Sequence, residues 1–541
     1  MQSNGHDETM IKRLFNLVFS TESCARILTH AWTAILASCF IFAGFGTACV
    51  PHTPKQSAGT ENLRLPMLTA TLDDIDQVYL YDRDISQLSL EGLKGLKQIE
   101  PDLVIKQHNK TVTIKMGATT IISDEIPDTP AGSANFIIQF LNHAEPISYA
   151  LESASDERLF SAIFNNITLK LDRYSRYSSA KQAAKDRIRR RGIGGIGVTI
   201  KSDVRGAKIV KTYRKLPAAE AGLKPGNIII SVGNSGIAGM TLSKIYSLIQ
   251  GPINVPVSLG IYRKDRASAK RYLLDRARIT SKTVYPTYHR RIGVFRISSF
   301  NKDTTSSLER EIKKVLRNHG NKMRGVIIDI RDNPGGLLDQ AVSIADLFLN
   351  KGPIISTRGR HKNSIQKFDA TPGDIISGLP IALLINGATA SAAEVLAAAL
   401  QDNGRAILIG SSSFGKGTVQ TILRLPNDGE IILTWARIIA PSGYALQTLG
   451  VLPTVCTVNK LNAKEIVDQF QEIGINRSRI QLHRRRIVDY RNAKQPADIK
   501  KLCPWQPTKY MGLDRRVADL MLKGQDKYTR AINLTRIPPG S

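Results

Sequence analysis

Three short segments of the chain contain residues whose types and spacing could catalyse acyl transfer. In the first, residues 389–394 (TASAAE), Ser391 lies among small residues where a helix is expected to begin. Small neighbours let a substrate backbone reach the hydroxyl, and amides at a helix N-terminus stabilise developing negative charge. Serine is also a common helix cap, so this segment alone does not separate a nucleophile from a cap.

The second segment, residues 329–336 (DIRDNPGG), directly follows a short apolar stretch that is expected to be a buried strand. Two glycines after a proline leave backbone amides open to close approach by a substrate, as an oxyanion hole requires. An ordinary strand-to-helix turn could have the same composition. Taken alone, this segment is therefore ambiguous too.

The third segment, residues 410–417 (GSSSFGKG), nearly matches the phosphate-binding loop G-x-x-x-x-G-K-[ST]. Gly417 stands where that loop needs a serine or threonine for magnesium. Residues 418–423 have the pattern of a strand, whereas a phosphate-binding loop opens a helix. We therefore reject nucleotide binding, which leaves Lys416 available for other chemistry.

Together the three segments resemble the carboxyl-terminal processing proteases, also called tail-specific proteases. The family's nucleophile lies in a motif like residues 389–394, and its lysine lies in a motif like residues 414–420. The resemblance implies that Ser391 is the nucleophile, that Lys416 is its base and that Gln420 orients the lysine. Lys416 follows Ser391 by 25 positions, which matches the family spacing.

The resemblance extends over approximately residues 72–453 and includes residues 172–177 (DRYSRY). Ala393 departs from the family, which often has serine there, and so does Thr454, where aspartate is usual. Neither position is catalytic.

A lysine can take a serine proton only when its amine is neutral. The free side chain has a pKa of about 10.4, and burial can lower that pKa by several units. The amides of Ala392 and of Gly335 or Gly336 would form the oxyanion hole. We expect hydrolysis through an acyl-enzyme, with no metal and no cofactor.

Two other readings compete with this one. A Ser-His-Asp hydrolase would need a catalytic histidine, but His289, His319 and His361 are the histidines of the expected core and none lies in a suggestive motif. A non-catalytic PDZ scaffold on a degenerate protease fold would be expected to lose a catalytic residue. Ser391, Lys416 and the glycine pair are all intact.

Residues 192–262 consist of short strands punctuated by glycine, and residues 216–229 (LPAAEAGLKPGNII) resemble the central motif of PDZ domains carried by bacterial proteases. Asn227 replaces the usual aspartate of that motif. Such a domain adds an extended chain end as an extra strand, and a glycine loop captures the terminal carboxylate. We expect protein or peptide substrates with free, apolar C-termini as partners. The candidate loop consists of Gly195, Ile196, Gly197 and Val198.

These motifs fall on an α/β multidomain architecture: a helical N-terminal region, an inserted PDZ β-domain and an α/β protease core of layered strands and helices. Residues 256–262 are expected to be the last strand of the PDZ domain. The predicted divisions are a basic segment 1–30, a membrane anchor or lipoprotein signal 31–50, a linker 51–60, a helical domain 61–180, the PDZ domain 190–265, the protease core 280–458 and a basic extension 459–541.

Residues 31–50 (AWTAILASCFIFAGFGTACV) contain no charged side chain and are long enough to span a bilayer as a helix. Lys12, Arg13 and Arg26 precede them, which predicts a body outside the cytoplasm, in the periplasm of a bacterial cell envelope. Residues 46–49 (GTAC) also resemble a lipoprotein cleavage site, although Gly46 stands where a leucine-like residue is expected. Inner-membrane anchoring and lipidation both stay open.

The formal net charge of +29 is high, but only 6% of residues are aromatic and no nucleic-acid-binding module is apparent. We therefore expect no nucleic-acid partner. The charge suits anionic lipid headgroups or a solvated basic surface. Cys456 and Cys503 could form one disulfide or remain two separate buried thiols.

Overall fold

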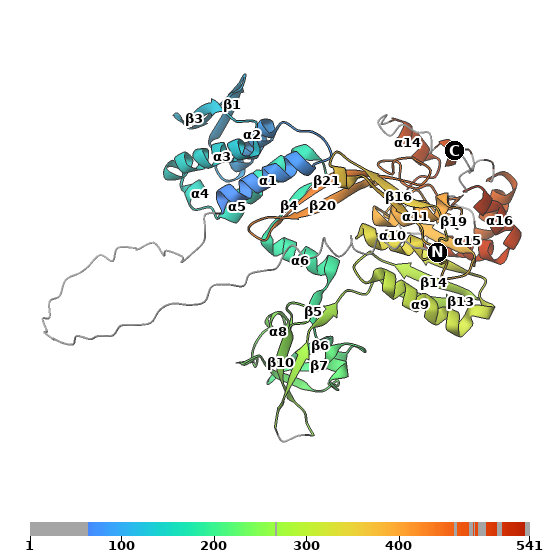
Figure 1. Ribbon diagram of the computed structural model, residues 1–541. Helices are drawn as coiled ribbons and strands as arrows, with labels where there is room; N and C mark the ends of the chain where they lie inside the picture. Colours follow the sequence, from blue (N-terminus) through green and yellow to red (C-terminus); the bar gives the residue numbers. More distant parts are fainter. Residues whose placement is uncertain are drawn as a thin grey trace, which may run out of the picture. The chain divides into compact units, whose positions relative to one another are not determined.

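The computed structural model describes residues 63–265, 268–458, 462–474, 494–505 and 511–535, with a few single positions between 476 and 484 (Figure 1). The predicted basic segment, anchor and linker, residues 1–60, lie outside the described residues. Among the described residues, no helix is both long and apolar enough to cross a bilayer.

The N-terminal region packs helices around an apolar core and carries a small antiparallel sheet. Strands β2 and β3 form a hairpin around Gly117, and a further strand, β1, pairs with β2. Ser155 caps the last helix, whose end leads into a short strand, β4, that pairs with the protease sheet. The elements are α1 (Arg64–Val78), α2 (Ile85–Gly95), β1 (Leu103–His108), β2 (Thr111–Met116), β3 (Thr119–Glu125), α3 (Pro130–Ala144), α4 (Tyr149–Glu152), α5 (Asp156–Leu171) and β4 (Arg176–Ser178).

The predicted PDZ domain has a sheet of order β11-β10-β8-β7-β6, with β6 at one edge. The expectation that residues 256–262 form the last strand is wrong, because β11 pairs with them. Lysine and arginine in β11 face solvent while Leu274 is buried, so a basic stretch still makes an edge strand. The elements are α6 (Ala180–Arg191), β5 (Ile193–Gly195), β6 (Val198–Asp203), β7 (Gly206–Thr212), α7 (Pro217–Glu220), β8 (Ile228–Val232), β9 (Ser235–Gly236), α8 (Leu242–Ile249), β10 (Pro256–Tyr262), β11 (Lys270–Asp275) and β12 (Ala277–Ile279).

The protease core is built on a six-stranded sheet of order β13-β14-β15-β18-β19-β22, parallel except for β13. Its inner strands are almost continuously apolar because helices cover both faces, as parallel sheets require. The elements are β13 (Val284–His289), β14 (Ile292–Ile297), α9 (Thr304–His319), β15 (Gly325–Asp329), α10 (Leu338–Asp346), β18 (Ile381–Ile385), α11 (Ala392–Asp402), β19 (Ala406–Gly410) and β22 (Val455–Cys456).

A second sheet, of order β17-β16-β21-β20, carries the residues that follow Lys416. Residues 418–423 lie in a strand of this sheet, as predicted, and not in the helix that a phosphate-binding loop would open. The strands are β16 (Pro353–Arg358), β17 (Gln366–Asp369), β20 (Thr418–Arg424) and β21 (Glu430–Ile439).

The C-terminal helices pack against the core. Val517, Met521 and Ile532 are buried against the sheet face formed by residues such as Ile327 and Leu384. The helices are α12 (Ala463–Gln469), which continues into a π-helical turn (Phe470–Gly474), α14 (Lys494–Lys501), α15 (Met511–Lys523) and α16 (Gln525–Asn533).

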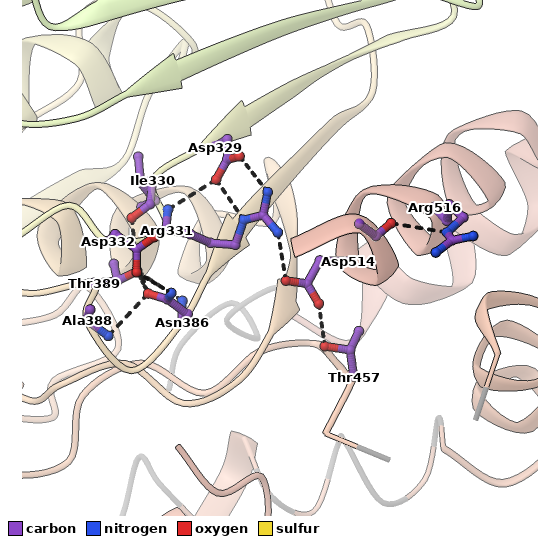
Figure 2. A network of polar contacts seen from close by, with 11 residues as sticks. Asp329, Ile330, Arg331, Asp332, Asn386, Ala388, Thr389, Thr457, Asp514 and Arg516 are labelled. Carbon is purple, nitrogen blue, oxygen red and sulfur yellow. Dashed lines mark hydrogen bonds and ion pairs between the residues drawn. The ribbon is translucent and has the colours of Figure 1, made fainter. Parts of the chain in front are cut away.

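A buried ion pair joins α15 to the segment that carries the glycine pair (Figure 2). The Arg331 guanidinium lies 2.6 Å from a carboxylate oxygen of Asp329 and 3.0 Å from one of Asp514. The second oxygen of Asp514 accepts a hydrogen bond of 2.6 Å from the Thr457 hydroxyl. The C-terminal helices thus help to hold the start of the DIRDNPGG segment.

Of the two states left open for the body cysteines, the structure has the disulfide. Cys456, at the end of β22, is bonded to Cys503, with a Cα–Cα distance of 5.9 Å. The bond fastens the segment after α14 to the edge of the central sheet.

Candidate active site

Ser391 occupies a strained turn between β18 and α11. Its backbone has φ 56° and ψ −120°, a region that non-glycine residues rarely adopt and that costs about 1–3 kcal/mol. Neighbouring contacts hold the turn in place: the Thr389 hydroxyl donates to the Ile330 carbonyl at 3.0 Å, and the Ala390 amide donates to the Asn333 carbonyl at 3.0 Å. The strain places Ser391 at the N-terminus of α11, where helix amides favour negative charge.

The Asn386 side chain ties the same turn to the DIRDNPGG segment (Figure 2). Its carbonyl oxygen accepts hydrogen bonds from the amides of Asp332 and Ala388, and its amide group donates to the Asp332 carboxylate at 2.8 Å. Two of the three predicted chemical segments are therefore cross-linked by side-chain hydrogen bonds.

A fully buried carboxylate, that of Glu394, joins the nucleophile turn to the lysine loop. It accepts hydrogen bonds from the backbone amides of Ser391 at 2.8 Å, Gly415 at 2.6 Å and Lys416 at 2.9 Å, and from the Ser413 hydroxyl. Burial raises the pKa of Glu394, and these four donors oppose that rise. Sequence reasoning did not assign this role, although the S-x-x-E spacing of a capping box was present as a signal.

Lys416 lies on the loop before β20, and its side chain is half-buried. Its ammonium lies 4.9 Å from the centre of the Tyr174 ring, a cation–π contact. Burial lowers the pKa of Lys416, and repulsion by Arg176 and Arg173 lowers it further, while Asp172 and Glu394 oppose the shift. Within the described residues the ammonium makes no hydrogen bond to the Ser391 hydroxyl; it rests over the aromatic ring.

The Gln420 side chain is fixed by two hydroxyls in the second sheet. Its amide group donates to Thr418 at 2.9 Å and to Thr434 at 3.2 Å. The Thr434 hydroxyl in turn donates to the Asp172 carboxylate at 3.1 Å. Gln420 is thus linked to the loop of residues 172–177, whose Tyr174 holds the lysine.

Gly335, Gly336 and Ala392 are the predicted oxyanion-hole residues. Gly335 has φ +99°, and a side-chain carbon there would lie 2.9 Å from the β-carbon of Ser391, so only glycine allows this approach. Its amide already donates to the Asn333 side chain at 2.8 Å. In the described part of the chain, the amides of Gly336 and Ala392 have no acceptor, which favours them as the two donors to an oxyanion.

A cavity of about 330 Å³ opens beside Tyr174, between the N-terminal region and the second sheet. Arg173 and Arg437 contribute positive charge to its wall, and Asp172 contributes a carboxylate that already accepts four hydrogen bonds. The remaining lining residues are Leu80, Tyr81, Thr418, Thr434 and Gln447.

The predicted PDZ loop lies at the start of the edge strand β6. Gly195 pairs with Ala277, Ile196 is buried, and Gly197 has φ +75° where a side-chain carbon would meet Leu216. Val198 is the first residue of β6. Further along this strand, the Ile200 amide donates to the Tyr246 hydroxyl of α8 at 3.2 Å. The Tyr246 hydroxyl therefore accepts the hydrogen bond of one backbone amide, that of Ile200, at the edge of the sheet.

The three core histidines lie apart from this hydrogen-bonded assembly. His319 stacks on Tyr288 with ring centres 3.9 Å apart, and His361 accepts a hydrogen bond from the Asn363 amide. His289 is the last residue of β13. Among the described residues, no histidine is hydrogen-bonded to Ser391.

We predict that Glu394→Gln slows phosphonylation of Ser391 by a fluorophosphonate probe, which displaces fluoride, by about tenfold or more. The glutamine NH₂ group cannot accept from the amides that now donate to Oε2, and a hydrogen bond to a charged group contributes about 1.5–3 kcal/mol. Labelling rates of wild type and variant are compared by mass spectrometry. Glu309→Gln, on the exposed face of α9, is the matched control. An unchanged rate in folded Glu394→Gln protein would contradict the assigned role.

Two protein-family models match parts of the chain. Residues 291–457 match peptidase family S41, and residues 186–262 match the PDZ domain. The chain is 39% identical over 311 residues to the carboxy-terminal-processing protease of Bartonella bacilliformis, a match that covers 57% of this chain and 72% of that protein. It is 32% identical over 307 residues to the carboxy-terminal processing protease CtpA of Bacillus subtilis, covering 56% of this chain and 65% of that one, just under two thirds.

Among solved structures, the photosystem II D1 C-terminal processing protease aligns with 74% of this chain and 96% of its own, at 21% identity and a TM-score of 0.36. The PDZ domain of a carboxy-terminal protease from Vibrio cholerae, solved with a peptide, aligns with 16% of this chain and 96% of its own, at 24% identity and a TM-score of 0.15. The predicted α/β architecture with an inserted PDZ domain is confirmed by the family matches. The chain therefore belongs to peptidase family S41, the serine-type peptidases that include the carboxy-terminal processing proteases.

Proposed function

We propose that the protein is a serine endopeptidase that cleaves protein substrates near their C-termini through a Ser391–Lys416 acyl-enzyme mechanism. The observation that carries this proposal is the Glu394 carboxylate, which accepts from the amides of both Ser391 and Lys416 and so fixes the two loops together. The environment of Lys416 supports its role as the base, because partial burial and two nearby arginines both favour the neutral amine.

In this mechanism the neutral amine of Lys416 leaves the Tyr174 ring and takes the proton of the Ser391 hydroxyl. The serine oxygen attacks the scissile carbonyl carbon, and the amides of Gly336 and Ala392 stabilise the oxyanion. The lysine then gives its proton to the departing amine, which leaves an ester between Ser391 and the substrate. Water attacks that ester with the lysine again as base, and this step restores the serine.

We predict that Ser391→Ala and Lys416→Arg each abolish cleavage of a C-terminally tailed protein while the fold is retained. Arginine cannot serve as the base because it stays protonated at any working pH. In wild type, kcat/KM should rise with pH through the lowered pKa of Lys416, because the amine is active only when deprotonated. Product formation is followed by mass spectrometry and folding by circular dichroism. Cleavage by well-folded Lys416→Arg protein would overturn the mechanism.

The PDZ domain is proposed to recognise the substrate tail by adding it along β6. The proposal is supported by the position of β6 at an edge of the PDZ sheet and by the glycine-containing segment that leads into it, Gly195, Ile196, Gly197 and Val198, whose backbone amides would receive the terminal carboxylate. The Ile200 amide already donates to the Tyr246 hydroxyl, so a bound peptide has to replace that hydroxyl with a backbone carbonyl.

We predict that Tyr246→Phe strengthens binding of an apolar-tailed peptide by about threefold to tenfold, because one neutral hydrogen bond contributes about 0.5–1.5 kcal/mol and no longer has to be broken. The dissociation constant is measured by fluorescence anisotropy on the full chain. The same peptide with an amidated C-terminus is the control and should bind much more weakly. Equal affinity for the amidated peptide would contradict tail recognition.

We further propose that the body works outside the cytoplasm, in the cell envelope, and is attached to the membrane by its N-terminal segment. The Cys456–Cys503 disulfide supports this location because disulfides persist in oxidising compartments. In intact cells treated with a thiol-alkylating reagent, peptides containing these cysteines should stay unmodified until a reductant is added. Alkylation of both cysteines without reduction would contradict the location.

A further inference from the structure

Residues 494–505, here named the clasp, lie in the C-terminal part of the chain for which the sequence suggested no chemistry. The clasp consists of α14 and the turn that follows it, and it is bonded to the central sheet through Cys503 and Cys456. Its contacts fall on the two loops that carry Ser391 and Lys416.

On the lysine side, the clasp binds the loop of residues 410–417 at two points. The Cys503 carbonyl accepts hydrogen bonds from the Ser412 amide at 3.3 Å and from the Ser412 hydroxyl at 2.5 Å. The Lys500 ammonium donates to the Phe414 carbonyl at 2.7 Å. These two points flank Ser413, whose hydroxyl donates to Glu394.

On the serine side, the Trp505 indole lies directly against Gly387 in the turn that leads to Ser391. A side-chain carbon at residue 387 would fall 1.0 Å from the indole Cδ1 atom, so the indole fills the space that a side chain would need. One short segment therefore touches both catalytic loops.

Lys500 also lies within the electrostatic environment of the buried Glu394 carboxylate. Its ammonium comes within 3.1 Å of the position that a side chain on Gly415 would take, and Gly415 donates its amide to Glu394. Burial lowers the pKa of Lys500, while the charge of Glu394 opposes that shift. A cation at this place compensates the buried negative charge that joins the two loops.

We propose that the clasp is a positioning element of the active site, with Lys500 and Trp505 as positioning residues and the Cys456–Cys503 disulfide as the bond that keeps them in place. The inference rests on the proposed Ser391–Lys416 mechanism. In the described part of the chain, the clasp meets the two loops through the Lys500 and Cys503 hydrogen bonds and the Trp505 indole, and Ile499 is buried in the core beside them. Covalent attachment at Cys503 keeps the local concentration of the clasp high.

Activity should therefore depend on the oxidised state of this disulfide. A dithiol reductant supplies two electrons and two protons, breaks the sulfur–sulfur bond into two thiols and is itself oxidised to a cyclic disulfide. Release of Cys503 removes the constraint on Lys500 and Trp505. The loop of residues 410–417 then keeps its hydrogen bonds to Glu394 but loses those that join Ser412 and Phe414 to the clasp.

The test compares kcat and KM for a tailed protein substrate in full-chain wild type, Lys500→Met and Lys500→Arg. We expect Lys500→Met to lower kcat about tenfold with KM changed less than twofold, since the loss of a charged hydrogen bond affects the catalytic loop and not the PDZ domain. Arginine can still donate to the Phe414 carbonyl and should recover most of the loss. Lys501→Met, on the exposed neighbour that pairs with Asp498, is the matched control and should behave as wild type.

A second arm uses the Cys456→Ser/Cys503→Ser double variant. Reduced wild type and the double variant should share the same lowered kcat, and reductant should have no further effect on the variant. Thermal melting and peptide binding report on the remaining fold; if the double variant does not fold, the Lys500 variants decide.

Different outcomes would overturn the role of the clasp and the proposed mechanism. Unchanged kcat in Lys500→Met and in reduced wild type, with Ser391→Ala inactive, would overturn the role of the clasp alone. Cleavage by Ser391→Ala would overturn the proposed mechanism itself. A loss in Lys500→Met that Lys501→Met shares, or that Lys500→Arg does not recover, would also count against the clasp.

Discussion

The active-site arrangement depends on the burial of one carboxylate. Glu394 is fully enclosed, and a charge or acid in that position is tolerated only when its oxygens are hydrogen-bonded. Three of its four donors are backbone amides, those of Ser391, Gly415 and Lys416. Because backbone amides cannot move without their loops, satisfying this carboxylate forces the nucleophile turn and the lysine loop into one arrangement. The strained backbone of Ser391 is stable only within such a framework.

The environment of Lys416, the proposed base, is assembled from parts of the chain that are distant in sequence. Tyr174, Arg173 and Arg176 come from the end of the N-terminal region, while Lys416 follows the central sheet. Strand β4 brings the first group to the second sheet by pairing with β21. The clasp then meets the same lysine loop at Ser412 and Phe414. The N-terminal region in this sense contributes to the proposed active site and is not a separate appendage.

Much of the fold could be predicted from sequence because its signals are local. The short apolar stretch at the DIRDNPGG segment indicated the buried strand β15, and the glycine-punctuated strands of residues 192–262 indicated the PDZ domain. The strand character of residues 418–423 was enough to dismiss a phosphate-binding loop. Strand β11 was not predicted because it begins with basic residues and has a single buried position, Leu274.

The contacts within the site were harder to predict because they join remote segments. The motif containing Glu394 was recognised, but its partners are amides of a loop some twenty residues further on, and backbone donors leave no trace in residue type. The hydrogen bond from the Gly335 amide to the Asn333 side chain likewise gives no signal in the sequence. The same holds for the place of Trp505 on Gly387, since nothing in either residue's neighbourhood indicates the other.

The proposed mechanism requires the folded chain to hold Lys416 ready to act as a neutral base. The pKa of Lys416 can be measured by NMR titration of its ε-carbon in folded Ser391→Ala protein with labelled lysine, assigned by comparison with Lys416→Arg. The mechanism predicts a pKa for Lys416 below the free-lysine value of about 10.4, because burial and two nearby arginines disfavour the ammonium. A Lys416 pKa at or above that value would contradict it.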